Sequence, residues 1–283
     1  MDINQKITEE LGVKKWQVDA AVSLIDEGNT IPFIARYRKE ATGTLDDEQL
    51  RTLFERLTYL RGLEEKKEQV LGSIEEQGKL TDELKAQILA AETLVVVEDL
   101  YRPYRPKRRT RASIAKEKGL EPLAALITLQ KADRPLEELA AEYVDPEKGV
   151  ETPEDALAGA RDIIAENISD EADFRSWIRK ATMKKGKIVS TAKDPEAESV
   201  YEMYYEFEEP AGKLAGHRKL ALNRGEKEKF LNVKVEAPEE EIQRYLQKQL
   251  VREENPYTTP LLQEAAQDSY KRLIAPAIER EIR

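Results

Sequence analysis

The chain has 283 residues, of which 40% are hydrophobic, and this is enough for one large domain or two ordinary ones. It carries 46 Lys and Arg against 56 Asp and Glu, so its net charge is −10, which argues against binding nucleic acid over its whole surface. The absence of cysteine and the presence of a single histidine exclude disulfides and thiol chemistry, and they leave few ways to build a zinc site or a histidine-activated nucleophile.

The composition also bears on location. No apolar run approaches the length of a membrane span, and the first residues lack the layout of a secretory signal. Since the chain has no cysteine, a cytoplasmic location is the simplest expectation, and no membrane partner is expected. We see no EF-hand spacing and no phosphate-binding glycine pattern, so we predict no metal and no cofactor.

Apolar residues recur at helical spacing through the first hundred positions. Residues 2–28 predict two short helices, and Pro32 suits the first turn of another. A long amphipathic stripe follows in residues 50–74. The acidic residues 46–48 precede it, where they are better explained as first-turn acids than as metal ligands.

The second half of the chain predicts more helices and some extended structure. Residues 187–191 suggest a brief extended piece, and residues 196–207 a helix with several tyrosines. Residues 219–235 fit either a β-hairpin, because apolar residues alternate there, or a helix that ends at Gly225. Residues 260–282 predict a long final helix. The predicted fold class is mainly α: a multi-helix scaffold, with or without one short β-hairpin.

We expect two domains. Residues 1–195 form an N-terminal helical domain, and residues 196–283 form a central helical region. The helical pattern runs up to Arg283 without a capping residue or a polar tail, so we expect that more protein follows it.

The basic segment, residues 101–116, is the most prominent local feature, with seven basic side chains and no acidic one. Pro103 and Pro106 disfavour a regular helix through it. Arginine binds phosphate through two hydrogen bonds, and tyrosine can stack on exposed bases. The candidate nucleic-acid-binding residues are Tyr101, Arg102, Tyr104, Arg105, Lys107, Arg108, Arg109 and Arg111.

Other interpretations stay open. The basic segment also fits a strap that lies across acidic helices, with its guanidiniums paired to Asp and Glu. Arg36, Arg38 and Lys39 are either a second phosphate-binding set or, as we prefer, a solvated helix face. Lys184, Lys185 and Lys187 either form a further binding set or, as we prefer, belong to an exposed turn whose charge is incidental. His217 has no nucleophile or acid placed beside it by the sequence, so we predict no catalytic residue and no enzyme.

Several segments resemble the bacterial Tex family, in the family's order along the chain. The two longest are IPFIARYRKE at residues 31–40 and EDLYRPYRPKRRTRA at residues 98–112. Shorter matches occur at 158–163, 217–226 and 270–274. Arg102 stands where the family often has leucine, which is a small departure.

The resemblance implies a mostly helical, non-catalytic part of a transcription accessory protein that binds RNA or DNA. It also implies a relation to a eukaryotic elongation factor and histone chaperone. A full member would continue into an RNase H-like domain that generally lacks catalytic acids, helix-hairpin-helix elements and a C-terminal OB-type RNA-binding domain. The main nucleic-acid contacts are attributed to that last domain. The expected partners are therefore RNA or DNA, mainly through absent domains, and the transcription machinery. The alternative is a scaffold or docking module that binds no nucleic acid itself.

Overall fold

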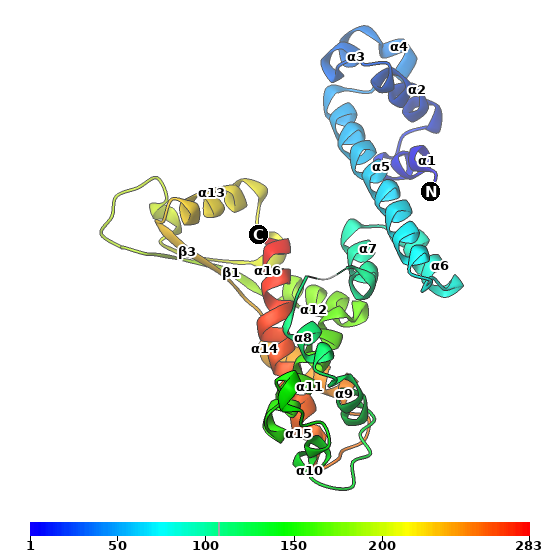
Figure 1. Cartoon of the computed structure of the whole chain (residues 1–283). Coiled ribbons are helices and arrows are strands. Elements are labelled where there is room, and N and C mark those ends of the chain that lie inside the picture. Colours follow the sequence, from blue (N-terminus) through cyan, green and yellow to red (C-terminus); the bar gives the residue numbers. More distant parts are fainter. Residues whose placement is uncertain (107) are drawn as a thin grey trace. The chain divides into compact units, whose positions relative to one another are not determined.

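The computed structural model describes residues 1–106 and 108–283. It is mainly helical and contains one small antiparallel sheet, so the predicted fold class is confirmed. The chain forms two compact units, Met1–Tyr104 (unit 1) and Arg105–Arg283 (unit 2) (Figure 1). The predicted domains, 1–195 and 196–283, stay a prediction. No helix in the described part of the chain has both the length and the apolar character needed to cross a membrane.

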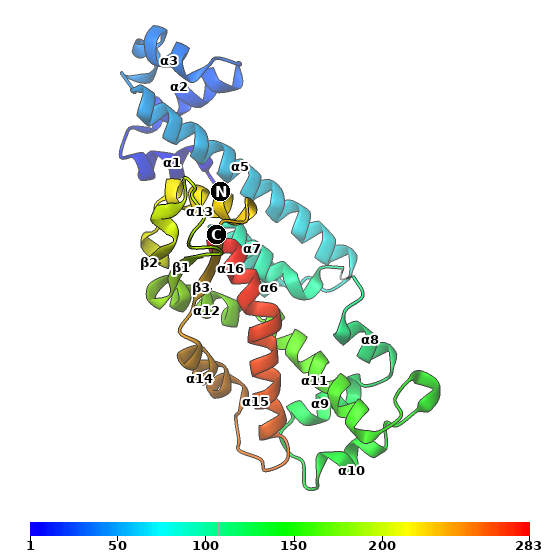
Figure 2. The same ribbon diagram turned by 90° about the vertical axis from the view of Figure 1, so that its left-hand side faces the viewer.

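Unit 1 consists of seven α-helices and a short 3-10 turn within the described residues. They are α1 (Ile3–Leu11), α2 (Lys15–Asp26), α3 (Ile31–Tyr37), α4 (Lys39–Thr42), α5 (Asp47–Glu76), α6 (Asp82–Ala90), α7 (Leu94–Tyr101) and η1 (Arg102–Tyr104). Helices α2, α3 and α4 gather at the N-terminal end of α5, and α6 lies at its other end (Figures 1 and 2).

Helix α5 has 30 residues and is the central element of unit 1. Its predicted apolar stripe faces the core, where the buried side chains are Leu50, Leu53, Leu57, Leu60, Leu63, Val70 and Ile74. Asp46 caps the helix, because its Oδ1 accepts a hydrogen bond from Gln49 N at 2.8 Å and the Gln49 side chain accepts one from Asp46 N at 3.0 Å. The acidic residues 46–48 therefore serve the helix terminus, as predicted.

The α3–α4 corner is fixed to unit 1 by caps and close packing. Thr30 caps α3, and Ile34 is fully buried. Gly43 follows α4 with a φ of 62°, where a side chain would be strained, and a methyl group there would also overlap the Trp16 ring. Gln17 Nε2 donates to Gly43 O at 3.0 Å. The corner is thus a built feature of the unit and not a loose loop.

Unit 2 contains all the remaining described helices and all the described strands. Its α-helices are α8 (Arg111–Glu117), α9 (Glu121–Thr128), α10 (Leu136–Ala141), α11 (Pro153–Asp170), α12 (Ala172–Lys185), α13 (Gly216–Lys227), α14 (Glu239–Leu250), α15 (Thr259–Asp268) and α16 (Ala275–Ile282). Its short turns are η2 (Pro146–Lys148), η3 (Glu202–Tyr204) and η4 (Ala211–Lys213), and a π-helix, η5 (Ser269–Ile274), lies between α15 and α16.

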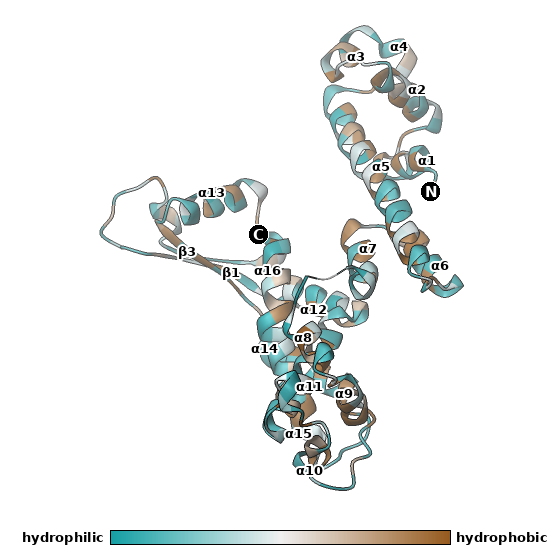
Figure 3. Ribbon diagram, in the orientation of Figure 1, coloured by the Kyte–Doolittle hydropathy of each residue, from teal (hydrophilic) through white to brown (hydrophobic). Residues whose placement is uncertain are grey.

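Helix α11 is the centre of the helical part of unit 2. Thr152 caps it and Pro153 occupies its first turn. Helices α8, α9, α10 and α15 all contact it, and its buried side chains include Ala156, Ala160 and Ile163. Helices α7 in unit 1 and α9 in unit 2 carry hydrophobic residues over much of their length (Figure 3), as expected for short helices that pack against a larger one.

The sheet of unit 2 has the order β2–β1–β3, and both pairs are antiparallel. Its strands are β1 (Lys187–Ala192), β2 (Glu206–Pro210) and β3 (Leu231–Glu236). Strand β1 confirms the predicted extended piece. Ser190 is the central residue of β1, opposite Phe207 on one side and Val233 on the other.

The predicted hairpin at 219–235 is wrong. Residues Gly216–Lys227 form α13, and only the second half of the segment is a strand, β3, which pairs with β1. The alternative helix is confirmed, but it continues past Gly225. A methyl group at Gly225 would overlap Leu231, so glycine lets the helix and the strand approach closely and does not end the helix.

The predicted helix at 196–207 is also wrong. This segment is irregular, with the 3-10 turn η3 followed by β2. The Tyr205 hydroxyl donates a hydrogen bond to Ala197 O at 2.6 Å. The centres of the Tyr201 and Phe230 rings lie 5.8 Å apart. The pairing of 206–210 with β1 and the contact of Tyr201 with Phe230 therefore override the local helical spacing.

The predicted final helix at 260–282 is confirmed in extent but not in regularity. It runs as α15, η5 and α16. Ser269 Oγ, inside the π-helix, donates to Ala165 O of α11 at 2.6 Å. Pro276 follows in the first turn of α16, where the irregular turn before it accommodates a residue without a backbone N–H.

Candidate nucleic-acid interface

The basic segment begins in unit 1 and continues into unit 2. Tyr101 ends α7, and residues Arg102–Tyr104 form η1. Arg105 starts unit 2, and Arg111 is the first residue of α8. Lys107 lies outside the described residues, so its role stays a prediction.

The two tyrosines of the segment pack against α5. The hydroxyl groups of Tyr101 and Ser73 lie 2.8 Å apart, and Lys66 Nζ lies 5.9 Å from the centre of the Tyr101 ring. Gln77 Nε2 donates to Tyr104 O at 2.8 Å. Both rings are half-buried against the core of unit 1, which limits the ring surface left for the predicted stacking on bases.

The arginines of the segment differ in exposure. Arg102 is half-buried, and its Nε has no hydrogen-bond partner among the described residues. Arg105, Arg108, Arg109 and Arg111 are exposed. In the part of the chain that the structure describes, neither Arg108 nor Arg109 forms an ion pair or a side-chain hydrogen bond. The alternative prediction, in which the guanidiniums pair with the chain's own carboxylates, therefore does not hold for Arg108 and Arg109.

Helix α8 anchors the C-terminal end of the segment. Thr110 caps the helix through a reciprocal pair of bonds: Ser113 N donates to Thr110 Oγ1 at 3.0 Å, and Thr110 N donates to Ser113 Oγ at 2.7 Å. The buried Ala115 of α8 meets α11 at Gly159, where a methyl group would approach its Cβ to 3.3 Å. The arginines before Thr110 thus extend from a fixed point.

Arg111 faces a mixed set of charges. A hollow of about 350 Å³ between α8 and α11 is lined by Arg111 and Lys118 on one side and by Asp155 and Asp162 on the other. Burial raises the pKa of Asp162, and the charge of Arg111 acts in the opposite direction. The hollow therefore contains its own counter-charges, which makes Arg111 a weaker anion ligand than Arg108 and Arg109.

A second acid near this hollow has the opposite shift. Two hydrogen bonds from the Arg272 guanidinium, at 2.9 and 3.1 Å, lower the pKa of Asp268. Arg272 also lies 3.9 Å from Asp162. The sequence reasoning missed this cluster, although the spacing of Asp268 and Arg272, four residues apart on a helix, is a recognisable signal.

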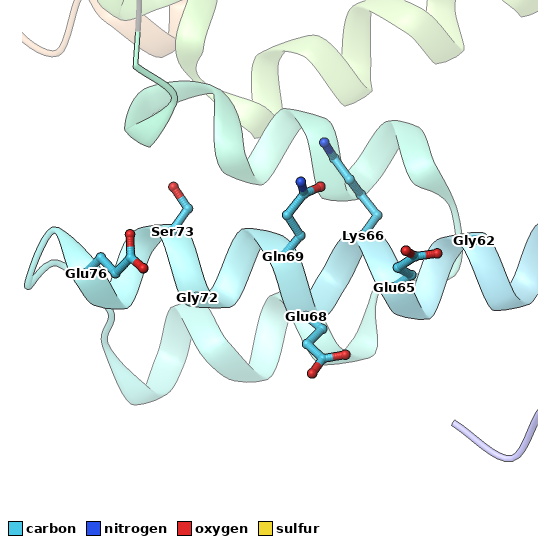
Figure 4. A pocket seen from close by; sticks show the side chains of 8 residues that line it. All are labelled: Gly62, Glu65, Lys66, Glu68, Gln69, Gly72, Ser73 and Glu76. Atoms are coloured by element: carbon cyan, nitrogen blue, oxygen red, sulfur yellow. The ribbon is translucent and has the colours of Figure 1, made fainter.

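Unit 1 has a larger hollow, of about 700 Å³, along α5 (Figure 4). Its lining includes Glu65, Glu68 and Glu76, and Lys66 in the same wall is paired with Glu98 at 3.2 Å. Carboxylates outnumber cations there, so the hollow does not suit a phosphate.

The basic turn at 184–187 and His217 are two further candidates from the sequence. In the basic turn, Lys185 pairs with Glu241 at 2.7 Å and Lys187 pairs with Glu208. His217 is exposed and borders a hollow of about 470 Å³ whose described lining contains no carboxylate. Without an acid to orient it, His217 lacks the partner that a histidine base normally has.

Comparison with known proteins adds the family context. Residues 1–75 match the family described as Tex-like protein N-terminal domain, and residues 131–283 match Tex central region-like. The described part of the basic segment lies between these two regions.

Among curated proteins, the chain is 50% identical over 99% of its length to the uncharacterized protein YdcI of Bacillus subtilis, of which it covers 40%. It is 45% identical over 82% of its length to the transcriptional accessory protein Tex of Neisseria gonorrhoeae, of which it covers 31%. The human S1 RNA-binding domain-containing protein 1 is 29% identical over the whole chain, which covers 30% of that protein. The chain thus spans well under half the length of these relatives.

Proposed function

The chain belongs to the Tex-like family, and from this we propose that it is a non-catalytic, helical part of a transcription accessory protein that binds nucleic acid. The phosphate ligands are the exposed arginines of the basic segment, with Arg108 and Arg109 as the principal pair and Arg105 and Arg111 beside them. One observation supports this most directly: in a chain of net charge −10, these two adjacent arginines are exposed and form no ion pair among the described residues.

The physical argument rests on counter-charges. An exposed arginine that has no carboxylate partner keeps its charge and its N–H groups available for an outside anion, and two adjacent arginines concentrate that charge at one place. Guanidinium groups bind phosphate through two parallel hydrogen bonds. Contacts of this kind hold a nucleic-acid backbone without reading its sequence.

The relatives suggest the kind of polyanion. The Neisseria gonorrhoeae protein is named a transcriptional accessory protein, and the human relative is named for an S1 RNA-binding domain. RNA is therefore the first ligand to test, with DNA as the comparison. The proposal includes a cytoplasmic location, where the transcription machinery of a bacterium lies.

The second candidate function is a scaffold that binds no nucleic acid. It is favoured by the packing of Tyr101 and Tyr104 against α5, which uses the start of the basic segment for the internal structure of unit 1. In this case the segment would only connect and position other parts of a longer protein.

A salt titration of binding tests the proposal. Labelled single-stranded RNA and DNA are titrated with this chain, and in parallel with the longer protein, between about 50 and about 200 mM salt. We expect binding by this chain that weakens steeply with salt. Absence of binding by this chain at the lowest salt, beside binding by the longer protein, would favour the scaffold. Cleavage of the RNA with added magnesium that persists through purification would contradict a non-catalytic role.

A further inference from the structure

The α3–α4 corner carries a second group of exposed cations, which the proposed function does not use. Arg36, Tyr37, Arg38 and Lys39 are all exposed, and Tyr37 is 53% exposed. They end α3 and begin α4, the corner that is fixed by Trp16 and Gly43. A large aromatic ring that remains so exposed on a rigid element is a feature of interaction surfaces.

Aromatic rings hold the two guanidiniums of this corner. The rings of Phe33 and Tyr37 lie 5.3 Å apart. Arg36 Cζ lies 5.2 Å from the centre of the Tyr37 ring, and Arg38 Cζ lies 5.1 Å from the centre of the Phe33 ring. Contacts of this kind orient a guanidinium but do not neutralise its charge. Arg38 Nη1 donates to Tyr37 O at 3.0 Å, and the other N–H groups of the two guanidiniums stay available for an acceptor from outside.

In the part of the chain that the structure describes, the cations of the corner have no acidic partner. Among the described residues, Arg36, Arg38 and Lys39 form no ion pair. Glu40 is the only acidic residue in the sequence from 29 to 45. This local imbalance lies in a chain that has more acidic than basic residues overall.

Other arginines of unit 1 behave differently. Arg51 pairs with Asp47 at 2.8 Å, Arg56 with Glu10 at 2.7 Å, and Arg61 with Asp26 at 2.7 Å. The arginines of α5 thus form ion pairs with carboxylates, whereas those of the α3–α4 corner form none among the described residues.

We propose that the α3–α4 corner of unit 1 binds single-stranded RNA, with Arg36, Arg38 and Lys39 on phosphates and a base stacked beside Tyr37. The inference rests on the proposed function, because it assigns a further contact to the same class of ligand. A single strand fits better than a duplex, since unstacked bases can lie on aromatic rings and on guanidinium planes. A single strand of RNA also fits the corner better than an acidic peptide does. The carboxylates of a peptide would pair with the cations of the corner but would leave the exposed Tyr37 ring without a partner.

The test compares two matched double variants within unit 1. Arg36→Gln with Arg38→Gln removes two charges from the corner. Lys79→Gln with Lys85→Gln removes two exposed charges elsewhere in the unit, from residues that form no ion pair among the described residues. Each lost phosphate contact on a single strand weakens binding about fivefold at about 0.1 M salt. We expect a loss of roughly 25-fold for the corner variant and little change for the control.

A third variant separates stacking from charge. Tyr37→Leu is expected to weaken RNA binding by about fivefold or more, because stacking of one base contributes about 1–3 kcal/mol, and to leave the salt dependence unchanged. Crosslinking to RNA that contains 4-thiouridine provides an independent readout, with the label expected on the peptide that contains Tyr37. Thermal melting of every variant checks that the fold is intact.

The outcomes separate this inference from the proposed function. If the corner variant binds RNA like the unaltered chain while Arg108→Gln with Arg109→Gln binds weakly, the inference is wrong and the proposed function stands. The reverse pattern supports the corner and contradicts the assignment to the basic segment. If polyglutamate binding depends on Arg36 and Arg38 but RNA binding does not, the corner takes an acidic protein partner and the inference is overturned. No RNA binding by the unaltered chain at low salt overturns both.

Discussion

Removal of the two charges at Arg108 and Arg109 gives the sharpest test of the basic segment. The variant Arg108→Gln with Arg109→Gln keeps side chains of similar length and polarity. Both arginines are exposed and form no ion pair among the described residues. The substitutions should therefore change the free energy of unfolding by no more than about 0.5 kcal/mol.

The expected loss of binding follows from the number of charges. Each phosphate contact on a single strand adds about 0.7 to the slope of the logarithm of the binding constant against the logarithm of salt concentration. Two contacts add about 1.4, so affinity at about 0.1 M salt should fall roughly 25-fold. This corresponds to about 2 kcal/mol. The measurement is fluorescence anisotropy with labelled single-stranded RNA over a series of salt concentrations.

A matched control lies on α14 of the same unit. Arg244→Gln with Lys248→Gln removes the same charge from two exposed positions that form no ion pair among the described residues. We expect the control to keep the slope of the unaltered chain. Equal slopes for all three proteins would refute the assignment. A fall of several degrees in the melting temperature of the Arg108 and Arg109 variant would instead show that the segment stabilises the fold.

Three further predictions concern packing and pH. Gly159→Ala should cost roughly 1–3 kcal/mol of stability, because its methyl group would overlap Leu120, which is 1% exposed. Gly72→Ala, where nothing lies within 4 Å, should instead gain about 0.5–1 kcal/mol. Both are measured by urea unfolding, and a Gly159→Ala variant that is as stable as the unaltered chain would contradict the close packing of Leu120 on α11. The lowered pKa of Asp268 means that its charged form is stabilised in the folded state. Asp268→Asn should therefore be less stable than the unaltered chain near pH 7. This difference in stability should shrink as pH falls through the ordinary aspartate range toward the lowered pKa. Asp162 has a raised pKa, so the folded state favours its protonated form. The stability of Asp162→Asn relative to the unaltered chain should therefore rise as pH rises from below the ordinary aspartate pKa through the raised value. A relative stability that falls over that range would show that the sign is wrong.

Local patterns were sufficient for the long helices. The apolar stripe of α5 and the acidic residues 46–48 predicted both the buried face and the start of that helix, because spacing and capping depend only on nearby residues. Prediction is reliable where the helix itself satisfies the backbone hydrogen bonds.

Local patterns failed where distant residues supply the hydrogen bonds. The tyrosines in 196–207 are spaced as in a helix, but β1 pairs with the backbone of 206–210 and holds it extended. Likewise, the alternation of Leu231 and Val233 correctly indicated a strand, but not that its partner is β1. Partner choice in a sheet depends on residues that a sequence window does not contain.

For the candidate site, the sequence located the cations but could not tell which of them are paired. Lys185 and Lys187 are paired with glutamates of α14 and β2, whereas Arg108 and Arg109 form no such pair among the described residues. All four lie in equally basic stretches. Only the tertiary structure shows which carboxylates lie within reach.

The π-helix η5 accommodates one residue more than a regular helix would hold over the same turn. The extra residue is absorbed within that turn, so α15 and α16 both keep their buried faces toward the core. Deletion of one residue between Ser269 and Ile274 that restored a regular helix would therefore leave Ile278 and Ile282 buried and keep Arg283 close to Glu226 of α13. Deletion of one residue within the regular α16 has no such compensation, and it would turn the residues after it by about 100° around the helix axis.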